Sequence, residues 1–168
     1  METKTVHKWL WVWDFDKDED WLNEMAQEGW ALESVGFCTY TFRRCEPGEY
    51  IIRLEMRSKD QDYEDFLRET GAELIGRVFL WIYCRRKAEY GPFDLFSDID
   101  SKIAHLQRIC RVLWIAGLAN LLIGLANSLN PGFWPSWVNL LCATLLMYGL
   151  GRIQGKKEAL EKERRLHE

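Results

Sequence analysis

Two apolar stretches decide the organisation of this chain: VLWIAGLANLLIGLANSL, residues 112–129, and WPSWVNLLCATLLMYGL, residues 134–150. Neither contains an Asp, Glu, Lys or Arg, and each approaches the roughly 20 residues with which a helix crosses a bilayer. Only Asn130–Phe133 separates them, which is long enough for a tight hairpin and little else. The sequence therefore predicts a transmembrane hairpin of two helices.

Basic residues flank the predicted hairpin on one side of the membrane. Arg108 and Arg111 precede the first stretch, and Arg152, Lys156 and Lys157 follow the second, whereas the connecting residues carry no charge. Because basic flanks stay preferentially on the cytoplasmic side, we expect a multi-pass protein of the cell membrane with both termini in the cytoplasm. The alternative is a buried helical hairpin of a soluble protein, which the sharp charged borders disfavour.

The N-terminal half of the chain has the periodicity of a small α+β domain. Alternating side chains predict four strands, and apolar faces that begin at capping residues predict two helices. The strands fall at residues 7–13, 31–45, 50–57 and 73–86, and the helices at residues 16–29 and 60–71.

The two halves of this domain resemble each other. Asp20–Glu24 parallels Asp65–Glu69, and Arg43-Arg44 recurs as Arg85-Arg86 at the same distance from a glycine. A twofold strand–helix–strand repeat is typical of a ferredoxin-like β-α-β-β-α-β domain. We therefore expect a four-stranded antiparallel sheet with both helices on one face.

The domain organisation follows from these elements. Residues 1–88 form the ferredoxin-like cytosolic domain, and residues 89–111 form a linker and a juxtamembrane helix. Residues 112–151 hold the two transmembrane helices, and residues 152–168 form a charged cytosolic tail.

A ferredoxin-like sheet leaves one face uncovered, and here aromatic and charged side chains would line it. An exposed aromatic surface implies a partner, a ligand or a cover. The predicted partner or ligand face comprises Trp9, Trp11, Trp13, Arg53, Glu55, Arg57, Trp81 and Tyr83. The strand period alone leaves open which row of the first strand points outward. The alternative is that this face packs on another subunit or on the juxtamembrane helix.

Apolar and small residues recur three and four positions apart along the helix that enters the membrane. Small residues allow helices to approach closely in lipid, and Asn can hydrogen-bond across a helix interface. The predicted seam comprises Phe96, Ile99, Ile103, Leu106, Leu113, Gly117, Asn120, Gly124 and Asn127. Two uses stay open: packing of the two membrane helices within one chain, and homo-oligomerisation along the first helix.

The sequence lacks the motifs of common catalytic and metal sites. Asp14, Asp16 and Asp18 superficially resemble a calcium-binding loop. Glu19 and Met25, however, stand where that loop needs Gly and Glu. The His and Cys residues show no zinc spacing, and neither a phosphate-binding Gly loop nor a nucleophile elbow is present. We therefore expect no enzyme, no metal and no cofactor, and the net charge of −4 argues against direct binding of nucleic acid.

Several phrases together resemble a bacterial family known only as a domain of unknown function. They are residues 7–9, 21–26 with 29–32, 40–42, 45–50 and 93–102, so the resemblance covers residues 7–110. The resemblance implies a cytosolic domain followed by membrane helices, in proteins commonly encoded beside PadR-type transcription regulators. It implies no catalytic residues.

Two functional hypotheses follow. The first is a non-enzymatic, membrane-anchored regulatory or interaction module whose cytosolic domain binds a protein partner, with a PadR-like transcription regulator as the candidate. The second is a membrane sensor that binds a small hydrophobic ligand on its aromatic sheet face or between its helices. The expected partners are thus the lipid bilayer, further copies of the chain and that regulator.

Overall fold

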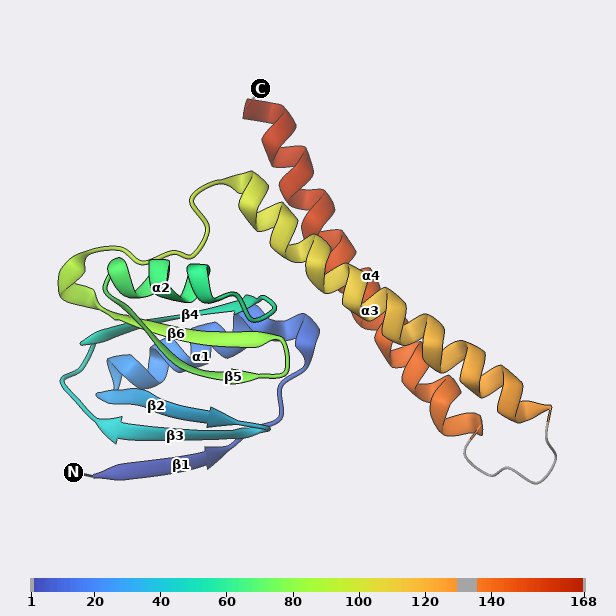
Figure 1. Cartoon of the computed structure of the whole chain (residues 1–168), viewed down its shortest axis with the longest axis horizontal. Helices are drawn as coiled ribbons and strands as arrows, with labels where there is room; N and C mark the ends of the chain where they lie inside the picture. The colour runs from blue at the N-terminus through green and yellow to red at the C-terminus, as the bar shows by residue number, and fades with distance from the viewer. Residues whose placement is uncertain (1, 130–135, 168) are drawn as a thin grey trace. The chain divides into compact units, whose positions relative to one another are not determined.

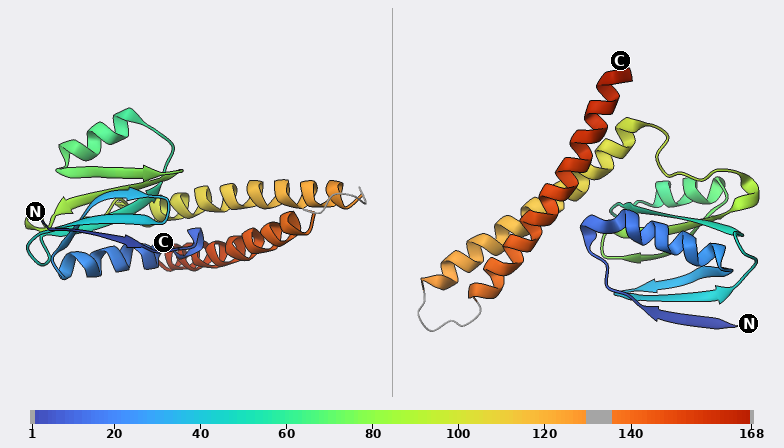
Figure 2. Two further views of the ribbon diagram at one scale, coloured as in Figure 1. Left: turned by 90° about the horizontal axis from the view of Figure 1, so that it is seen from below. Right: turned by 180° about the vertical axis from the view of Figure 1, so that it is seen from behind.

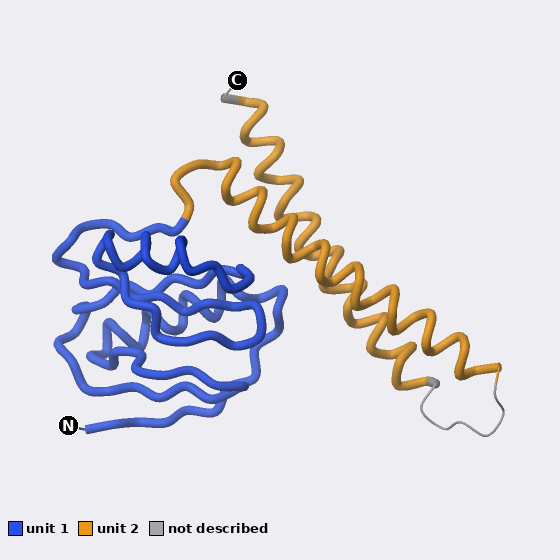
Figure 3. The backbone as a smooth tube through the Cα atoms, in the orientation of Figure 1, with its two compact units in different colours: residues 1–95 blue, residues 96–168 orange. Residues whose placement is uncertain are grey.

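The computed structural model describes residues 2–129 and 136–167 and divides the chain into two compact units, residues 1–95 and 96–168 (Figure 3). The first unit is built from strands and helices, and the second from two long helices. The first unit extends to Leu95, past the residue 88 at which the predicted domain ends. Phe93 and Leu95 pack against the apolar core beneath helix α2, which explains the difference.

Unit 1 is an α+β structure with two three-stranded antiparallel sheets, ordered β1-β3-β2 and β4-β6-β5 (Figure 1). Its elements in chain order are β1 (Thr3–His7), η1 (Val12–Asp14), α1 (Phe15–Gln27), β2 (Trp30–Gly36), β3 (Thr39–Arg44), β4 (Tyr50–Met56), α2 (Gln61–Glu69), β5 (Ala72–Val78), β6 (Trp81–Lys87) and η2 (Ala88–Tyr90).

The α+β class is confirmed, whereas the prediction of a single four-stranded ferredoxin-like sheet is wrong. The segments 31–45 and 73–86 each fold as a hairpin of two strands, with turns at Phe37-Cys38 and Phe79-Leu80. Neither turn contains the Gly, Asn or Asp that normally marks a two-residue hairpin. The first strand also lies earlier than predicted, at Thr3–His7, and the tryptophans that follow it are not in a strand.

The internal repeat is present as two strand–helix–strand–strand units. The β2–β3 register shifts between Leu32 and Ser34, and the β5–β6 register shifts at the matching place, between Leu74 and Gly76. The two halves meet where β2 approaches β5. A Cβ on Gly76 would lie 2.8 Å from the Val35 side chain, so a glycine is needed at this contact.

Helix α1 connects the two sheets, whereas α2 covers sheet β4-β6-β5 alone. The Trp21 ring of α1 meets Tyr40 and Phe42 of β3 edge-on, with ring centroids 5.0 and 5.8 Å apart. Phe42 is fully buried. The core under α2 comprises Leu67, Ala72, Ile82, Cys84 and Phe93.

Side chains of α1 also complete the outer edge of β4. The Asn23 amide donates to the Ile52 carbonyl (3.0 Å) and accepts from the Ile52 N–H (2.9 Å). The Leu54 N–H donates to the Glu19 carboxylate (2.9 Å). An open strand edge invites pairing with another chain, and these side chains occupy the groups that such a strand would use.

Asn23→Ala is expected to lower the free energy of unfolding by about 1–3 kcal/mol, because both Ile52 backbone groups lose their partner in a partly buried place. Urea unfolding of the detergent-solubilised full-length protein, followed by tryptophan fluorescence, measures the change. Asp20→Ala, at an exposed position of the same helix, is the control and should stay close to wild type. Equal effects of the two substitutions would contradict this role for Asn23.

Unit 2 is an antiparallel pair of helices, α3 (Ile99–Ser128) and α4 (Ser136–His167), which lie side by side in both views of Figure 2. Asp98 caps α3 by accepting from the Ser101 N–H at 2.7 Å. Two glycines set the close approach of the helices. A Cβ on Gly117 would meet the Met147 side chain, and one on Gly124 would lie 2.8 Å from Leu140.

Among the described residues, one helix, α3, is long and apolar enough to cross a membrane. Of the two predicted transmembrane helices, α3 alone passes this test within the described residues. The apolar part of α4 is shorter, because Arg152 follows Leu150 closely and the helix then becomes highly charged. Trp134 and Pro135, which begin the predicted second span, lie outside the described residues.

Candidate functional site

Four exposed aromatic residues, Trp9, Trp11, Phe37 and Phe79, meet at one end of unit 1 and are called the aromatic tip below. The β2–β3 and β5–β6 turns, which hold the two phenylalanines, lie at the same end of the unit (Figure 1). Ring centroids are 5.5 Å apart for Trp9 and Trp11, 5.8 Å for Trp9 and Phe37, and 5.9 Å for Phe37 and Phe79. Trp11 also stacks on the buried Trp13 at 4.7 Å, which attaches the cluster to the core.

One residue of each turn has an unfavourable backbone conformation. Cys38 and Phe79 have φ angles of 53° and 52°, a left-handed region that costs an L-residue about 1–2 kcal/mol. Phe79 is nevertheless 78% exposed, so burial does not compensate for the strain at this residue, and Phe37, which precedes Cys38, is 63% exposed. Stability alone therefore does not explain phenylalanine at these turns.

The outer edge of β1 forms a second distinctive surface. The Lys8 N–H donates to the Cys38 carbonyl at 3.1 Å, and the β1–β3 register is continuous. Because hydrogen bonds alternate along an antiparallel strand, the N–H and C=O groups of Thr3, Thr5 and His7 point away from β3. Within the described ranges no strand pairs with this side of β1.

The outer edges of β1 and β4, which are equivalent in the two repeats, thus differ in what occupies them. Strand β4 occupies the same place in its sheet as β1 does in the other. Asn23 and Glu19 occupy the edge of β4, whereas along β1 the residues on either side of the half-buried Val6 are exposed. Thr5 and Thr41 bring their hydroxyl oxygens within 3.5 Å on the face beside this edge, which is therefore polar at this place.

A buried carboxyl group links the two sheets inside unit 1. Tyr40 of β3 and Tyr83 of β6 both donate to Asp18 Oδ2, each at 3.1 Å. Burial raises the pKa of Asp18 to about 6, against the smaller lowering effects of the two tyrosines and of Lys8. Burial, followed by the Asp18 charge, raises the pKa of both tyrosines above their usual range. Asp18 can therefore change protonation near neutral pH, but its closed surroundings suit a structural role better than a substrate site.

The tryptophans and tyrosine of the predicted sheet face are divided between surface and core. Trp9 and Trp11 are exposed, whereas Trp13, Trp81 and Tyr83 are buried. Their separation follows from the hairpin turns and from η1, which replace the expected long strands. The exposed aromatic surface is therefore the tip of unit 1 and not an open sheet face.

The charged members of the predicted face form ion pairs within unit 1. Glu55 is buried, accepts from the Tyr63 hydroxyl at 2.7 Å and pairs with Arg57 at 3.2 Å. Arg53 pairs with Glu19 at 3.4 Å. These groups form ion pairs inside unit 1, and none of them contributes to the aromatic tip.

The predicted seam of α3 lies against α4. Its buried members are Ile103, Leu106, Leu113, Gly117 and Gly124, whereas Phe96, Ile99, Asn120 and Asn127 are half-buried. Asn120 donates to the Ala116 carbonyl of its own helix at 2.9 Å. Of the two uses predicted for the seam, packing within one chain is the arrangement observed.

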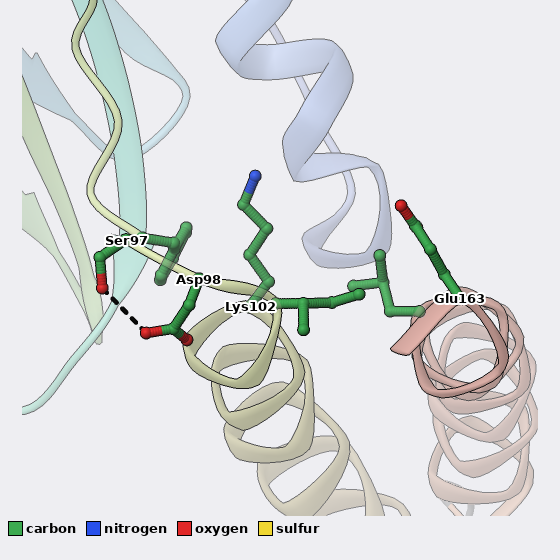
Figure 4. Close-up of a pocket in the computed structure, with 7 residues that line it drawn as sticks. Ser97, Asp98, Lys102 and Glu163 are labelled. Atoms are coloured by element: carbon green, nitrogen blue, oxygen red, sulfur yellow. Dashed lines mark hydrogen bonds between the residues drawn. The ribbon is translucent and has the colours of Figure 1, made fainter. Parts of the chain in front are cut away.

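A small hollow lies where α3 begins and α4 ends. It encloses about 230 Å³ and is lined by Phe96, Ser97, Asp98, Ile99, Lys102, Leu160 and Glu163. Figure 4 shows the Ser97 hydroxyl donating to Asp98 at 3.0 Å, which belongs to the start of the helix. The volume is below the range of about 300–1,000 Å³ typical of ligand sites, so we assign no ligand to it.

No set of three or more His, Cys, Asp or Glu side chains within residues 2–129 and 136–167 is placed to hold a metal ion. Asp14, Asp16 and Asp18 lie in η1 and the first turn of α1. Asp14 pairs with Lys17 at 3.0 Å, and Asp18 faces the two tyrosines. The acidic residues thus have structural partners around the helix start.

Sequence reasoning missed three of these features for different reasons. Phe37 and Phe79 carry no turn signal, although they occupy matching positions when the two repeats are aligned by their double arginines. In the sequence Asn23 stands out only as part of a repeated phrase, because its hydrogen-bond partner on β4 lies far away along the chain. The open edge of β1 depends on strand order, which the hairpin turns determine.

Comparison with known proteins places the chain in one family. No curated protein and no solved structure matches it significantly. A family described as a protein of unknown function, DUF2812, matches residues 14–118, which run from η1 into the middle of α3. The match confirms the resemblance to an uncharacterised family, and the chain belongs to the DUF2812 family.

Proposed function

We propose that the chain is a non-enzymatic interaction module whose cytosolic unit 1 binds a protein partner along the edge of β1. In this proposal α3 crosses the cell membrane and α4 crosses back beside it, which gives a two-pass topology. The basic residues Arg108, Arg111 and Arg152 favour cytoplasmic placement of both termini. A PadR-like transcription regulator is the candidate partner, on the strength of the family resemblance alone.

The exposed surface of unit 2 supports anchoring in lipid. Only 28% of the apolar window of α3 is buried, whereas a core helix of a water-soluble protein would be mostly covered. Apolar side chains on the outside of both helices include Trp114, Ile115, Leu122, Leu125, Trp137, Leu141 and Leu145. An apolar surface of this extent needs lipid or protein around it.

The observation that carries the partner-binding proposal is the contrast between the two strand edges. The β4 edge is occupied by Asn23 and Glu19, and the equivalent β1 edge offers the backbone groups of Thr3, Thr5 and His7. Proteins commonly protect such edges, and many interaction domains use an open edge to add a strand from a partner. Backbone hydrogen bonds would supply affinity, and the threonines beside the edge would contact alternate side chains of the added strand.

Crosslinking from the edge in living cells tests this proposal. A photoreactive amino acid replaces Thr3 in the full-length protein, and adducts are resolved from the membrane fraction. Thr5→Pro removes an outward N–H without removing a β1–β3 hydrogen bond, a placement that edge strands tolerate. We expect it to reduce a discrete heteromeric adduct by on the order of tenfold, the effect of losing about 1.4 kcal/mol of binding. Thr5→Ala keeps the backbone donor and should retain the adduct.

Two results would contradict the proposal. An adduct of unchanged intensity in Thr5→Pro would mean that the partner does not use the strand edge. An adduct containing two copies of the chain and nothing else would mean that β1 pairs with itself. The recovered partner also identifies or excludes a PadR-like regulator directly.

A further inference from the structure

We propose that the aromatic tip of unit 1 inserts into the headgroup region of the same bilayer that α3 crosses. The inference rests on the proposed anchoring and assigns a different surface from the β1 edge. Its occupant is the lipid interface, so the tip would orient the domain while the strand edge remains available to a protein partner.

The composition of the tip suits the membrane interface. Tryptophan is enriched at headgroup depth, where its ring is buried and its N–H stays hydrated. Trp9 is 59% exposed and Trp11 41%, and they contact each other and Phe37. The turn residues Phe37-Cys38 and Phe79-Leu80 carry no charge, so insertion brings no turn carboxylate toward the phosphates.

The backbone of the turns gives a second argument. Hairpin turns on a water-exposed end are normally built from Gly, Asn and Asp. Here a left-handed φ of 52° at Phe79 holds an exposed phenylalanine at the extremity of the hairpin. The same substitution of turn chemistry occurs in both repeats, and the two phenylalanine rings meet at 5.9 Å. Four rings from three separate segments thus form one contiguous aromatic cluster.

The connection between unit 1 and α3 is short. Phe93 and Leu95 still pack in unit 1, and α3 begins at Ile99. The part of α3 before Val112 rises about 20 Å above the apolar span, at 1.5 Å per residue. A domain of this size has a radius of gyration of about 12 Å and a diameter of about 30 Å. The short connection therefore confines a domain of this size to the neighbourhood of the membrane surface.

The tether also favours lipid over a diffusing protein as the occupant. A surface fixed to the same chain is encountered at a high effective concentration without a separate association step. Even weak insertion of four rings then suffices, because the anchoring helix has already brought the domain to the membrane. A protein partner would need to displace the bilayer, which is always nearby because the same chain is anchored in it.

Quenching by brominated lipid in nanodiscs tests the proposal on the full-length protein. Bromine on the upper acyl chain quenches tryptophans that contact lipid at that depth. The contribution of the tip is the difference between wild type and Trp9→Phe with Trp11→Phe, which keeps apolar rings and removes the fluorophores. We expect this difference signal to be quenched by brominated lipid and shielded from aqueous iodide.

Paired substitutions then connect the quenching to the tip. Phe37→Ser with Phe79→Ser removes the apolar turn side chains at exposed positions and should abolish lipid quenching of the difference signal. Phe66→Ser is the matched control, since Phe66 is 57% exposed on α2. This control should retain the quenching.

The remaining outcomes separate the tip from the anchor. Quenching of the other tryptophans, which include Trp114 of α3, without quenching of the tip signal would overturn tip insertion and leave anchoring intact. A signal shielded from both lipid and iodide would mean that protein covers the tip, which also overturns the proposal. Absence of lipid quenching for all tryptophans would overturn the anchoring and tip insertion together.

Discussion

Asp18→Asn is expected to stabilise unit 1 at pH 7.5 and to flatten its stability profile between about pH 4 and pH 6. The native carboxyl has a pKa of about 6, whereas an unfolded Asp titrates near 3.9. Between these values the native protein binds more protons than the unfolded chain, so stability falls as pH rises and the loss is complete above about pH 6. The difference corresponds to on the order of 3 kcal/mol, and the net gain in Asp18→Asn is smaller because a neutral amide accepts weaker hydrogen bonds from Tyr40 and Tyr83.

Urea unfolding of the solubilised full-length protein at pH 4.5, 6.0 and 7.5, with tryptophan fluorescence as the signal, checks this expectation. Asp20→Asn is the control, since Asp20 is exposed on the same helix. The control should keep the wild-type pH dependence. Two results together would contradict this account: a wild-type stability that rises between pH 4.5 and 6.0, and a lower stability of Asp18→Asn than of wild type. They would show that the ionised carboxylate is stabilising.

Leu122→Arg is expected to impair membrane insertion of α3 strongly. Leu122 is 58% exposed near the middle of the apolar stretch, where an arginine costs about 3 kcal/mol on insertion scales. The same residue near the membrane border costs much less, since its side chain reaches the headgroups. Val112→Arg, at the start of the stretch, is therefore the matched control.

A glycosylation acceptor in a spacer inserted between α3 and α4 measures insertion in microsomes. Modification requires the loop to cross the membrane, so it also tests the proposed two-pass topology. The unsubstituted protein and Val112→Arg should be modified, and Leu122→Arg should be modified much less. Equal modification of the two arginine variants would contradict a span centred near Leu122, and an unmodified parent protein would contradict the two-pass topology.

The fold could be predicted from sequence where the signal was local. Helix α2 follows the capping residue Asp60, which accepts from the Tyr63 N–H, and both α1 and α2 end before glycines with positive φ, Gly29 and Gly71. Strand β4 coincides with an alternating run. The apolar character of α3 required only composition and length. In each case the residues that determine the element lie within it or directly beside it.

The errors arose where structure depends on distant partners. The turns at Phe37-Cys38 and Phe79-Leu80 contain residues that ordinarily extend a strand, so the sequence pattern predicts one strand where each hairpin has two. Trp9 and Trp11 alternate as a strand would, but β3 pairs with Thr3–His7 instead. The edge of β4 is filled by Asn23 from a helix, which periodicity does not reveal.

The candidate site residues show the same difference between local sequence signals and dependence on distant partners. Trp9 and Trp11 belong to the predicted partner or ligand face, although the strand period leaves open which row points outward, and they lie in the aromatic tip. Trp81 and Tyr83 have the same residue chemistry but are buried, because β6 is the central strand of its sheet. The phenylalanines that complete the tip could be found only by aligning the repeats.

The central claim is that α3 anchors the chain in a bilayer, and alkaline carbonate extraction followed by flotation of the full-length wild-type protein tests it most directly. At high pH, peripheral proteins leave the membrane, whereas a spanning helix stays because exposing its apolar surface to water is unfavourable. The account predicts that the protein floats with the lipid after extraction. Quantitative release into the aqueous fraction as a well-behaved folded protein would contradict it, since the exposed apolar faces of α3 and α4 would then have a cover other than lipid.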